Sequence, residues 1–329
     1  MSKKLMEEVK DAFRVQGYAL KTEQQYMNWI RRYVRHYLPK HPRETGADGV
    51  REYLTFLAVE KNISPSTQNQ CLAALLFLYK VLGVEIGPVD MVRAKKDKII
   101  PTVLTVDETL NLLSHLDGVY KIMGEITYGG GLRLMECLRL RVKDIDFDNF
   151  SITLRATKSN KDRVTCLPEM VIPKLRMHLE KVRAIHNEDL ANGLGEVEMP
   201  YAYDRKSPKA GLEWGWQYVF PAAGFSRDPR SGRIGRHHIF ETSYQRAVKK
   251  AVKSAGIVKS PVGVHTLRHS FATHLYQAGV DIRTIQELLG HQKIETTMIY
   301  VHLLGGAAVR SPLDRHLSTP FIRRVLVES

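Results

Sequence analysis

Apolar residues recur at helical spacing through most of the first hundred residues, and clear start and stop signals interrupt them. Thr22 with Gln25 has the pattern of a capping box, so we predict that a helix begins there. Ser64 before Pro65 suits a helix start, and Gly83 suits a helix end. The apolar faces predict four main helices, over residues 5–16, 26–38, 50–60 and 66–82.

The second half combines helical spacing with one stretch of strict alternation. Thr105 and Glu108 form another capping-box pattern, and helical segments follow it to about residue 141. Alternating polarity over 151–156 and 163–167, around a turn-rich KSNKD segment that contains Lys158, predicts a small antiparallel sheet. Helical spacing then returns, which gives a fold class of mainly α with a small antiparallel β-sheet. The expected later helices cover residues 171–190, 237–256, 265–279, 282–290 and 294–304.

Changes in composition and in hydrophobic periodicity along the chain predict its domain organisation. A basic, proline-containing stretch with little periodicity predicts a linker at 89–103, between a helical domain, 1–88, and an α+β domain, 104–304. Residues 191–237 are rich in Gly, Pro, Tyr and Arg and hold two of the three tryptophans. This segment is too long for a plain connection, so we expect it to be functional. The tail, 305–329, has no evident partner in its own sequence.

Charge narrows the classes of partner. Lys and Arg number 49 against 35 acidic residues, which gives a net charge of +14. Such an excess favours a polyanionic partner, because neutralising phosphates releases condensed counterions. Charge by itself leaves a basic but unrelated surface equally open.

Compartment and membrane signals are weak or absent. Three scattered cysteines without a CxxC pair indicate neither a disulfide framework nor a cysteine zinc site, so a reducing compartment is expected. The first residues lack the apolar core of a signal peptide, and no apolar run approaches the ~18 residues of a membrane span. We therefore expect a cytoplasmic protein without membrane association, nucleoid-associated when bound to DNA.

Four local patterns carry candidate chemistry: GGGLRLME at 129–136, HTLRH at 265–269, LLGH at 288–291, and Tyr300, nine positions after His291. In this order they resemble the arginine, HxxR, LGH and tyrosine boxes of the tyrosine recombinase (phage integrase) family. The resemblance spans the catalytic half, and a helical half before it agrees. It implies a SAM-like, core-binding DNA-binding domain in front of a recombinase catalytic domain.

The residue types suit attack on a phosphodiester. Attack gives a crowded phosphorane with more localised charge, and cationic donors stabilise that state more than the ground state. The guanidinium fork donates two parallel bonds, so we expect Arg133 and Arg268 to clamp the phosphate and His291 to donate a third bond. His265, three residues before Arg268, faces the same side of a helix. Such a cluster can replace a metal ion, so no metal or other cofactor is expected.

The resemblance assigns the remaining roles. It implies that Tyr300 is the nucleophile, that His265 accepts its proton, and that Lys158 protonates the leaving 5′-oxygen. Lys161 and Arg163 stand close to Lys158 in sequence and leave that position less defined. The product is a 3′-phosphotyrosine link, which a 5′-hydroxyl can reverse without ATP.

Each residue also has a plainer interpretation. Arg133 by itself could simply pair with Glu136 on a helix surface, whereas the resemblance implies that Glu136 orients the site. Three histidines, at 265, 269 and 274, could suggest zinc, but HExxH and an obvious acidic third ligand are absent. Tyr300 could be an ordinary buried aromatic residue, but no other tyrosine follows the LGH box.

The segment 191–237 narrows the resemblance to integron integrases, which integrate and excise gene cassettes. In that subfamily the insertion helps to recognise a folded single-stranded hairpin site through bases extruded from its stem. An unpaired base needs a flat apolar partner and a few donors. The residues expected to supply them are Trp216, Pro229, His237 and His238. The alternative is that Trp216, like Trp214, only anchors a long loop.

The expected partners are a duplex recombination site, a folded single-stranded site and further copies of the chain. Recombinases of this class work as tetramers on DNA, and by analogy the tail, 305–329, docks on a neighbouring subunit. A recombinase restricted to duplex sites is the alternative within the same class. A DNA-binding protein that kept the fold without catalysis is the alternative from another class.

Overall fold

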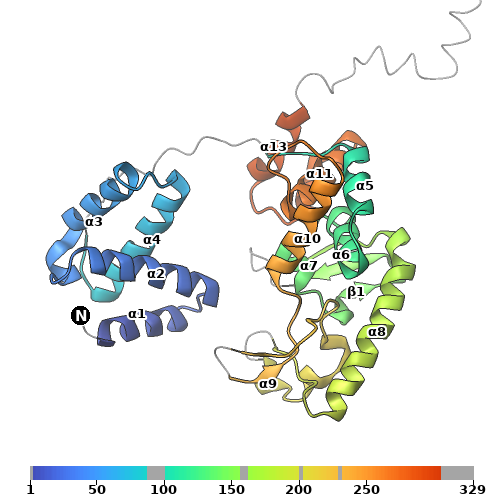
Figure 1. Cartoon of the computed structure of the whole chain (residues 1–329), viewed down its shortest axis with the longest axis horizontal. Helices are drawn as coiled ribbons and strands as arrows, with labels where there is room; N and C mark the ends of the chain where they lie inside the picture. Colours follow the sequence, from blue (N-terminus) through green and yellow to red (C-terminus); the bar gives the residue numbers. More distant parts are fainter. Residues whose placement is uncertain (1–2, 87–100, 156–161, 200–202, 229–231, 305–329) are drawn as a thin grey trace, which may run out of the picture. The chain divides into compact units, whose positions relative to one another are not determined.

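The computed structural model describes residues 3–86, 101–155, 162–199, 203–228 and 232–304. The chain forms two compact units, Met1–Ile99 and Ile100–Ser329. Unit 1 is helical, and unit 2 adds small antiparallel sheets to its helices (Figure 1). The predicted fold class is therefore confirmed. No helix within the described ranges is both long and apolar enough to cross a membrane.

Unit 1 has four helices in its described part: α1 Lys3–Val15, α2 Leu20–His36, α3 Pro42–Val59 and α4 Pro65–Leu82. They enclose an aromatic core, in which Phe13 stacks on Phe77 with ring centroids 3.9 Å apart. The hydroxyls of Tyr33 and Tyr79 meet at 2.8 Å inside it, so each buried hydroxyl has a partner. The four predicted helices are present, but α2 and α3 begin at Leu20 and Pro42, well before the predicted residues 26 and 50.

The ends of these helices test the capping predictions. Ser64 Oγ accepts the backbone N–H of Thr67 at 3.3 Å, and Gly83 ends α4 with φ +66°, as predicted. The prediction at Thr22 is wrong, because α2 begins at Leu20 after an extended Ala19. Thr22 is therefore the third residue of α2, and the first buried residue of this helix is Glu23.

Unit 2 begins with a confirmed capping box, in which Thr105 Oγ1 accepts from Glu108 and the Glu108 carboxylate accepts from the Thr105 N–H. Its helices are α5 Val106–Ser114, α6 Gly118–Gly129, α7 Leu134–Leu138, α8 Ile172–Ala191, α9 Tyr203–Lys206, α10 Glu241–Ser254, α11 Val264–Gln277, α12 Ile282–Leu289 and α13 Ile294–Leu304. Short 3-10 turns occupy Val142–Asp144, Glu169–Val171, Ala210–Leu212 and Trp214–Trp216.

The predicted sheet is present, with one strand more than expected. β1 Ile145–Asp146, β2 Ser151–Leu154 and β3 Arg163–Cys166 pair antiparallel in that order, with Ile152 opposite Thr165. The segment that joins β2 to β3, including Lys158, lies outside the described residues. A second pair, β4 Ser226–Arg227 with β5 Ile234–Gly235, belongs to the segment predicted as an insertion.

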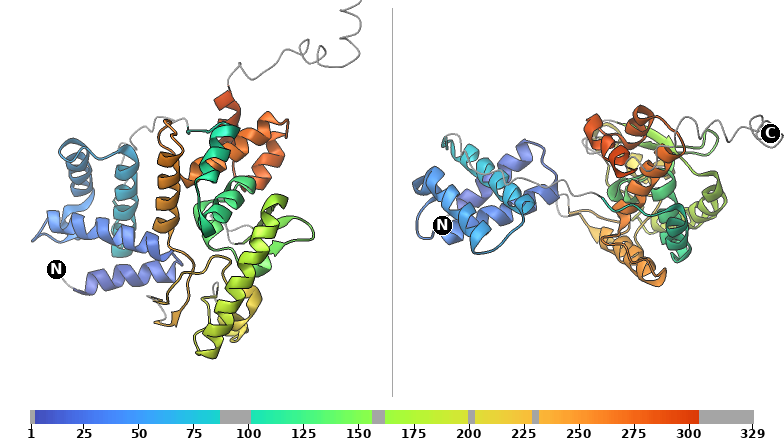
Figure 2. Two further views of the ribbon diagram at one scale, coloured as in Figure 1. Left: turned by 45° about the vertical axis from the view of Figure 1, so that its right-hand side comes forward. Right: turned by 90° about the horizontal axis from the view of Figure 1, so that it is seen from above.

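Different secondary-structure elements lie at the two ends of unit 2. Helices α5, α6 and α11–α13 gather at one end, and α9 with the β4–β5 pair lies at the other (Figures 1 and 2). Helix α8 runs along the side between them. The candidate catalytic motifs and the candidate base-contact segment therefore occupy separate regions of unit 2.

Candidate active site

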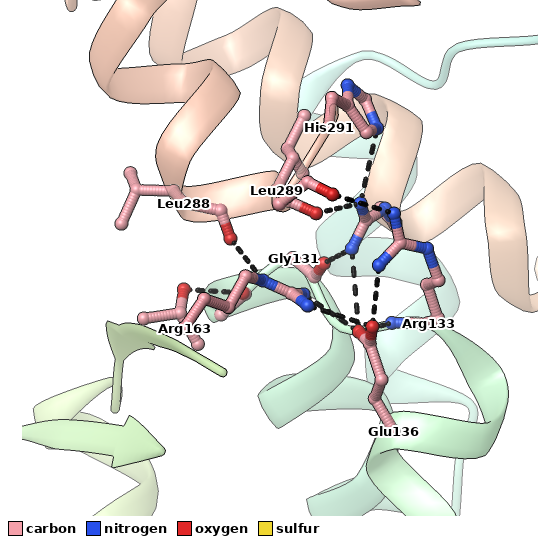
Figure 3. A network of polar contacts seen from close by, with 11 residues as sticks. Gly131, Arg133, Glu136, Arg163, Leu288, Leu289 and His291 are labelled. Carbon is pink, nitrogen blue, oxygen red and sulfur yellow. Dashed lines mark hydrogen bonds and ion pairs between the residues drawn. The ribbon is translucent and has the colours of Figure 1, made fainter. Parts of the chain in front are cut away.

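Glu136 lies in the first turn of α7 and gathers two guanidinium groups around its carboxylate (Figure 3). Arg133 donates from its backbone N–H to Oε2 at 2.8 Å and from Nη1 to Oε1 at 2.6 Å. Arg163 arrives from β3 with two more bonds, of 2.8 and 2.7 Å. Burial would raise the pKa of Glu136, but these bonds and charges lower it to about 2. The carboxylate is therefore a fixed anion that orients both arginines.

Arg268, on α11, is almost completely buried, and its guanidinium lies 3.6 Å from the Glu136 carboxylate. It donates to the carbonyls of Gly131 at 2.5 Å and Leu289 at 2.6 Å. Burial, and then the charge of a neighbouring arginine, lower the pKa of Arg268 to about 9, so it remains cationic at neutral pH. Position 131 requires glycine, because its φ is +63° and a Cβ would lie 2.4 Å from the Phe271 ring.

His291 follows the left-handed turn at Gly290, where φ is +62°. Its Nδ1 lies 2.9 Å from Thr297 Oγ1, and its Nε2 lies 3.3 Å from Arg268 Nη2. A guanidinium can only donate, so Nε2 is the acceptor and Nδ1 carries the ring hydrogen. Burial, and then the charge of Arg268, lower the pKa of His291 to about 3. In the free chain this histidine accepts from Arg268, whereas we expected it to donate to a phosphate.

Tyr300, on α13, is 2% exposed, and its hydroxyl lies 3.0 Å from Nδ1 of His269. Its ring is nearly parallel to that of His291, with centroids 6.4 Å apart. Burial raises the pKa of Tyr300, while the charges of Arg268 and Arg133 oppose that rise. A protonated phenol therefore lies close enough to the two arginines to be affected by their charges, within a single chain.

His265, the expected proton acceptor, lies on the exposed side of α11. Its ring centroid is 6.5 Å from that of His269, one helical turn further along. The hydrogen bond to the Tyr300 hydroxyl comes from His269, which the sequence analysis did not single out for this role. Lys158, the expected general acid, lies outside the described residues.

Arg163 is the residue of the site that the sequence analysis considered only as a neighbour of the expected general acid. Besides its two bonds to the carboxylate, it donates from Nε to the Leu288 carbonyl at 2.8 Å. Its side chain is 7% exposed and lies on the inward face of β3 with Thr165, whereas Val164 points outward. An arginine on the inward face of an alternating strand is the signal that could have identified it.

An open cavity of about 830 Å³ lies beside this network, between β3 and α12. Arg163 and His291 form part of its wall, and Arg283 and Gln286 add further donors. Donors of this kind suit a stretch of phosphodiester backbone. The cavity is lined by Asp162, Arg163, Val164, Arg283, Thr284, Gln286, Glu287, Leu288, Gly290, His291 and Gln292.

Trp216, the expected base-stacking residue, is only 9% exposed. Lys143 Nζ lies 2.8 Å from the centroid of its ring, and the Tyr203 ring lies 4.9 Å away. Trp214 instead packs against the main core of unit 2. The indole of Trp216 therefore already has partners and offers little free surface in this conformation.

The two histidines expected beside it form an adjacent pair, with ring centroids 4.1 Å apart. His238 is buried, and its Nδ1–H donates to the Ile239 carbonyl at 2.8 Å, while burial lowers its pKa to about 4. His237 is more exposed and lies 3.2 Å from a Glu198 carboxylate oxygen. Pro229 lies outside the described residues.

Tyr218 and Arg141 join the histidine pair to Trp216. The Tyr218 ring lies 5.2 Å from His237 and 5.4 Å from His238. The Arg141 guanidinium lies 3.6 Å from the Tyr218 ring centroid and donates to the Trp216 carbonyl at 2.8 Å. The structure thus brings the described members of this predicted set together.

Replacing Glu136 by Gln is expected to destabilise unit 2, because it removes the anion shared by the buried arginines but keeps the side-chain shape. The expected loss in the free energy of unfolding is on the order of 3 kcal/mol. Urea denaturation measures it, with Glu125→Gln as the control. Glu125 pairs with the half-exposed Lys174 at 2.7 Å, so its replacement should cost clearly less. Equal losses of stability for the two variants would contradict the role of Glu136 as the anion shared by the arginines.

Family models and related proteins match the sequence of this chain. The model described as the phage integrase family matches residues 102–305, and the model of a phage integrase N-terminal SAM-like domain matches residues 5–87. An "Integrase/recombinase" from Escherichia coli is 45% identical over 317 residues, 95% of this chain and 94% of that protein. "Tyrosine recombinase XerA" from Pyrococcus horikoshii is 30% identical over 284 residues, 85% of each chain.

Solved structures are similar in fold. The Tn1549 transposon integrase in complex with transposon right-end DNA gives a TM-score of 0.61 at 17% identity, over 98% of this chain and 99% of that one. A lambda integrase dimer bound to a core site gives 0.60 at 17% identity, over 91% and 94%. XerH recombinase in a post-cleavage complex gives 0.56 at 19% identity, over 89% and 81%. At these identities the likeness establishes the fold alone.

Proposed function

The chain belongs to the phage integrase family and is a tyrosine site-specific recombinase that acts on DNA, and we propose that it breaks and rejoins each strand through Tyr300. The observation that carries this proposal is the clustering of Tyr300 with Arg268 and Arg133: His291 contacts Arg268 at 3.3 Å, its ring lies 6.4 Å from that of Tyr300, and both arginine charges act on the phenol. A buried phenol beside two oriented guanidiniums has the components that attack on a phosphodiester requires. The alternative of a DNA-binding protein without catalysis does not account for this pocket.

The arginines would act on the charge that develops during attack. As the Tyr300 oxygen bonds to phosphorus, charge concentrates on the nonbridging oxygens, and Arg133 and Arg268 donate to them. Burial, and then the charges of Arg268 and Arg133, depress the pKa of His291, and a phosphate anion beside it would offset these charges and raise that pKa toward its ordinary value. Protonated in this way, His291 would donate the third bond.

The bond that breaks is that between phosphorus and the 5′-oxygen of the next nucleotide. Lys158 supplies the proton that this leaving oxygen needs, and a 3′-phosphotyrosine remains. Attack by a 5′-hydroxyl from a second DNA end reverses the step. Two phosphodiester bonds are therefore exchanged without consumption of ATP.

More narrowly, we propose that the chain is an integron integrase, which integrates and excises gene cassettes between a duplex site and a folded single-stranded site. The support is the segment 191–237, which carries a clustered tryptophan, tyrosine and histidine pair. Arg236 holds this segment to α8 through two bonds to Asp189, of 2.6 and 2.8 Å. Aromatic rings of this kind can stack on extruded bases, here once a base displaces Lys143 and Tyr203 from the Trp216 ring. We also propose a homotetramer on DNA, with the tail, 305–329, as the docking segment.

Covalent trapping tests the function directly. A nicked suicide substrate loses the 5′-hydroxyl needed for rejoining, so a cleaving enzyme accumulates on its 3′-phosphate. The substrate is offered as a duplex and as a hairpin with extruded bases, and the linked peptide is identified by mass. We expect a covalent adduct on Tyr300 with both substrates. An adduct with the duplex alone would favour the duplex-only recombinase, and no adduct with either would contradict the proposal.

Trp216→Ala separates base recognition from loop anchoring. We expect the hairpin reaction to fall about 10-fold, which corresponds to the stacking energy of one base, while duplex binding changes less than about 2-fold. Strand-transfer rates and gel shifts measure the two quantities, and a melting curve confirms that the variant is folded. Trp216→Phe keeps an apolar ring and should lie between. Equal losses on the two substrates would favour the anchoring interpretation.

A further inference from the structure

Thr297 lies on α13, three residues before Tyr300, and its side chain is fully buried. Its Oγ1 lies 2.9 Å from Nδ1 of His291, which gives the buried hydroxyl a hydrogen-bond partner. We propose that Thr297 is a positioning residue for cleavage, which accepts the Nδ1 hydrogen of His291 and thereby directs Nε2 toward the scissile phosphate. This inference rests on the proposed function, since it takes His291 as the third donor to the phosphate.

The second contact of the imidazole decides the direction of this hydrogen bond. Nε2 of His291 lies 3.3 Å from Nη2 of Arg268. A guanidinium has no acceptor, so Nε2 accepts, the hydrogen of the neutral ring is on Nδ1, and Thr297 Oγ1 accepts it. Both nitrogens carry a hydrogen once His291 becomes an imidazolium. The bond to Thr297 is then kept, while Nε2 donates to the phosphate instead of accepting from Arg268.

The backbone of His291 is fixed separately from its ring. Its N–H donates to the Gln286 carbonyl at 3.1 Å, and its carbonyl accepts from the Gln286 side chain at 3.0 Å. These bonds leave the imidazole free to rotate about its side-chain torsions, and a flip of the ring would exchange the positions of Nδ1 and Nε2. The bond to Thr297 opposes that flip. One turn of α13 therefore carries both Tyr300 and the acceptor that orients His291.

The bond to Thr297 is strongest when His291 is charged, because hydrogen bonds from charged donors exceed those between neutral groups. Thr297 therefore favours the imidazolium, as a bound phosphate does, whereas burial and then the nearby cations lower the pKa of His291 in the free chain. The charged and titratable groups around the ring are Arg268 and His269 on α11, Arg133 before α7, Arg163 on β3 and Tyr300 on α13, with Arg283 and Glu287 of α12 in the wall of the adjoining cavity.

Thr297→Val removes the acceptor and keeps the shape of the side chain. We expect single-turnover adduct formation on the suicide duplex to slow about 30-fold at neutral pH, the effect of one hydrogen bond to a charged group, with DNA binding by gel shift within about 2-fold. Thr297→Ser keeps the hydroxyl and should stay within about 3-fold of the wild-type rate. Thr296→Val, at the neighbouring exposed position of α13, is the matched control and should react like the wild type. Equal losses for Thr297→Ser and Thr297→Val would overturn the proposal, because the hydroxyl would then not matter.

A double-mutant cycle with His291→Ala separates positioning of the imidazole from packing of α13. If Thr297 acts through His291, then Thr297→Val should slow adduct formation by less than about 2-fold further in the His291→Ala background. A further loss of about 30-fold in that background would overturn the proposal, because Thr297 would then act on the reaction without the histidine.

The pH profile of adduct formation gives another readout that packing alone would not change. The imidazolium is the reactive form, so the rate falls as the pH rises through the pKa of His291 in the DNA complex. Loss of the acceptor lowers that pKa, so the decline of Thr297→Val should begin at a lower pH than that of the wild type, and its deficit should shrink toward acidic pH. A deficit that is the same at every pH would overturn the proposal.

The wild type and Tyr300→Phe distinguish this inference from the function on which it depends. If the wild type gives no Tyr300 adduct, or if Tyr300→Phe gives the same adduct, the proposed function itself fails. If the wild type gives the Tyr300 adduct and Thr297→Val forms it within about 3-fold of the wild-type rate, only the role of Thr297 fails.

Discussion

Tyr300→Phe is expected to abolish the covalent protein–DNA adduct, with a rate at least about 10⁴-fold below that of the wild type. The variant loses only the hydroxyl, so its ring still packs against its neighbours on α11 and α12. One hydrogen bond to His269 disappears, which should cost about 1 kcal/mol of the free energy of unfolding. Denaturing gel analysis of a suicide-substrate reaction measures the adduct, and urea denaturation measures the stability.

Tyr128→Phe is a close control, because Tyr128 also bonds a histidine of α11, with its hydroxyl 2.8 Å from Nδ1 of His274. Both variants lose one tyrosine–histidine bond in the same unit, and only Tyr300→Phe removes the proposed nucleophile. We expect Tyr128→Phe to cleave at nearly the wild-type rate. Adduct formation by Tyr300→Phe would show that another residue carries the nucleophile.

Arg268→Lys is expected to slow cleavage about 1,000-fold although it keeps the positive charge. The guanidinium donates to the Gly131 and Leu289 carbonyls and to His291 in one fixed geometry. A single ammonium nitrogen cannot reproduce this fork, so the donors that face the phosphate lose their orientation. DNA binding should change less than about 3-fold, because the removed interaction forms mainly in the transition state. Single-turnover rates and gel shifts measure both effects.

Arg141→Lys controls for the loss of buried bonds. Arg141 also donates to two backbone carbonyls, those of Trp216 and Glu198, each at 2.8 Å, but outside the arginine pocket. Both variants should lose about 2 kcal/mol of stability, and Arg141→Lys should cleave a duplex at close to the wild-type rate. Equal loss of binding and rate in Arg268→Lys would instead make Arg268 a DNA anchor.

Local signals in the sequence predicted most helix limits. Ser64, Gly83 and the Thr105–Glu108 box act within a single turn, so the residues that decide the outcome are adjacent in the chain. The prediction at Thr22 failed, because α2 begins two residues earlier, at Leu20, after an extended Ala19 that makes no side-chain cap.

The sequence identified residues of the candidate site, but not which of them contact one another. The motif positions of Arg133, Arg268 and Tyr300 identified the residues that meet in one pocket. Which histidine touches the phenol depends on how α11 rotates against α13, and residue spacing leaves that rotation open. His269 and His265 differ by one turn, and only the packed structure distinguishes them.

Burial by distant segments of the chain explains the two remaining differences from the sequence predictions, at Arg163 and Trp216. Arg163 is buried through its bonds to the Glu136 carboxylate on α7; the alternation of β3 places it on the inward face, but no local pattern identifies that partner. Trp216 looked available because it lies in a long polar segment, yet Lys143 and Tyr203 cover it from distant parts of the chain. Contacts between remote segments decided both cases.

The arginine at the start of β3 makes assembly of the pocket nearly all-or-none. Three of its nitrogens are engaged at once, two by Glu136 and one by the Leu288 carbonyl beside the LGH turn. A shift of β3 alone would leave the buried Glu136 carboxylate without this partner, which would cost about 3–5 kcal/mol of the free energy of unfolding. A displacement of β3 therefore also displaces α7 and α12. Conformations in which only part of this arginine–glutamate network is formed are scarcely populated. We therefore expect little unproductive nicking of DNA by a partly assembled site.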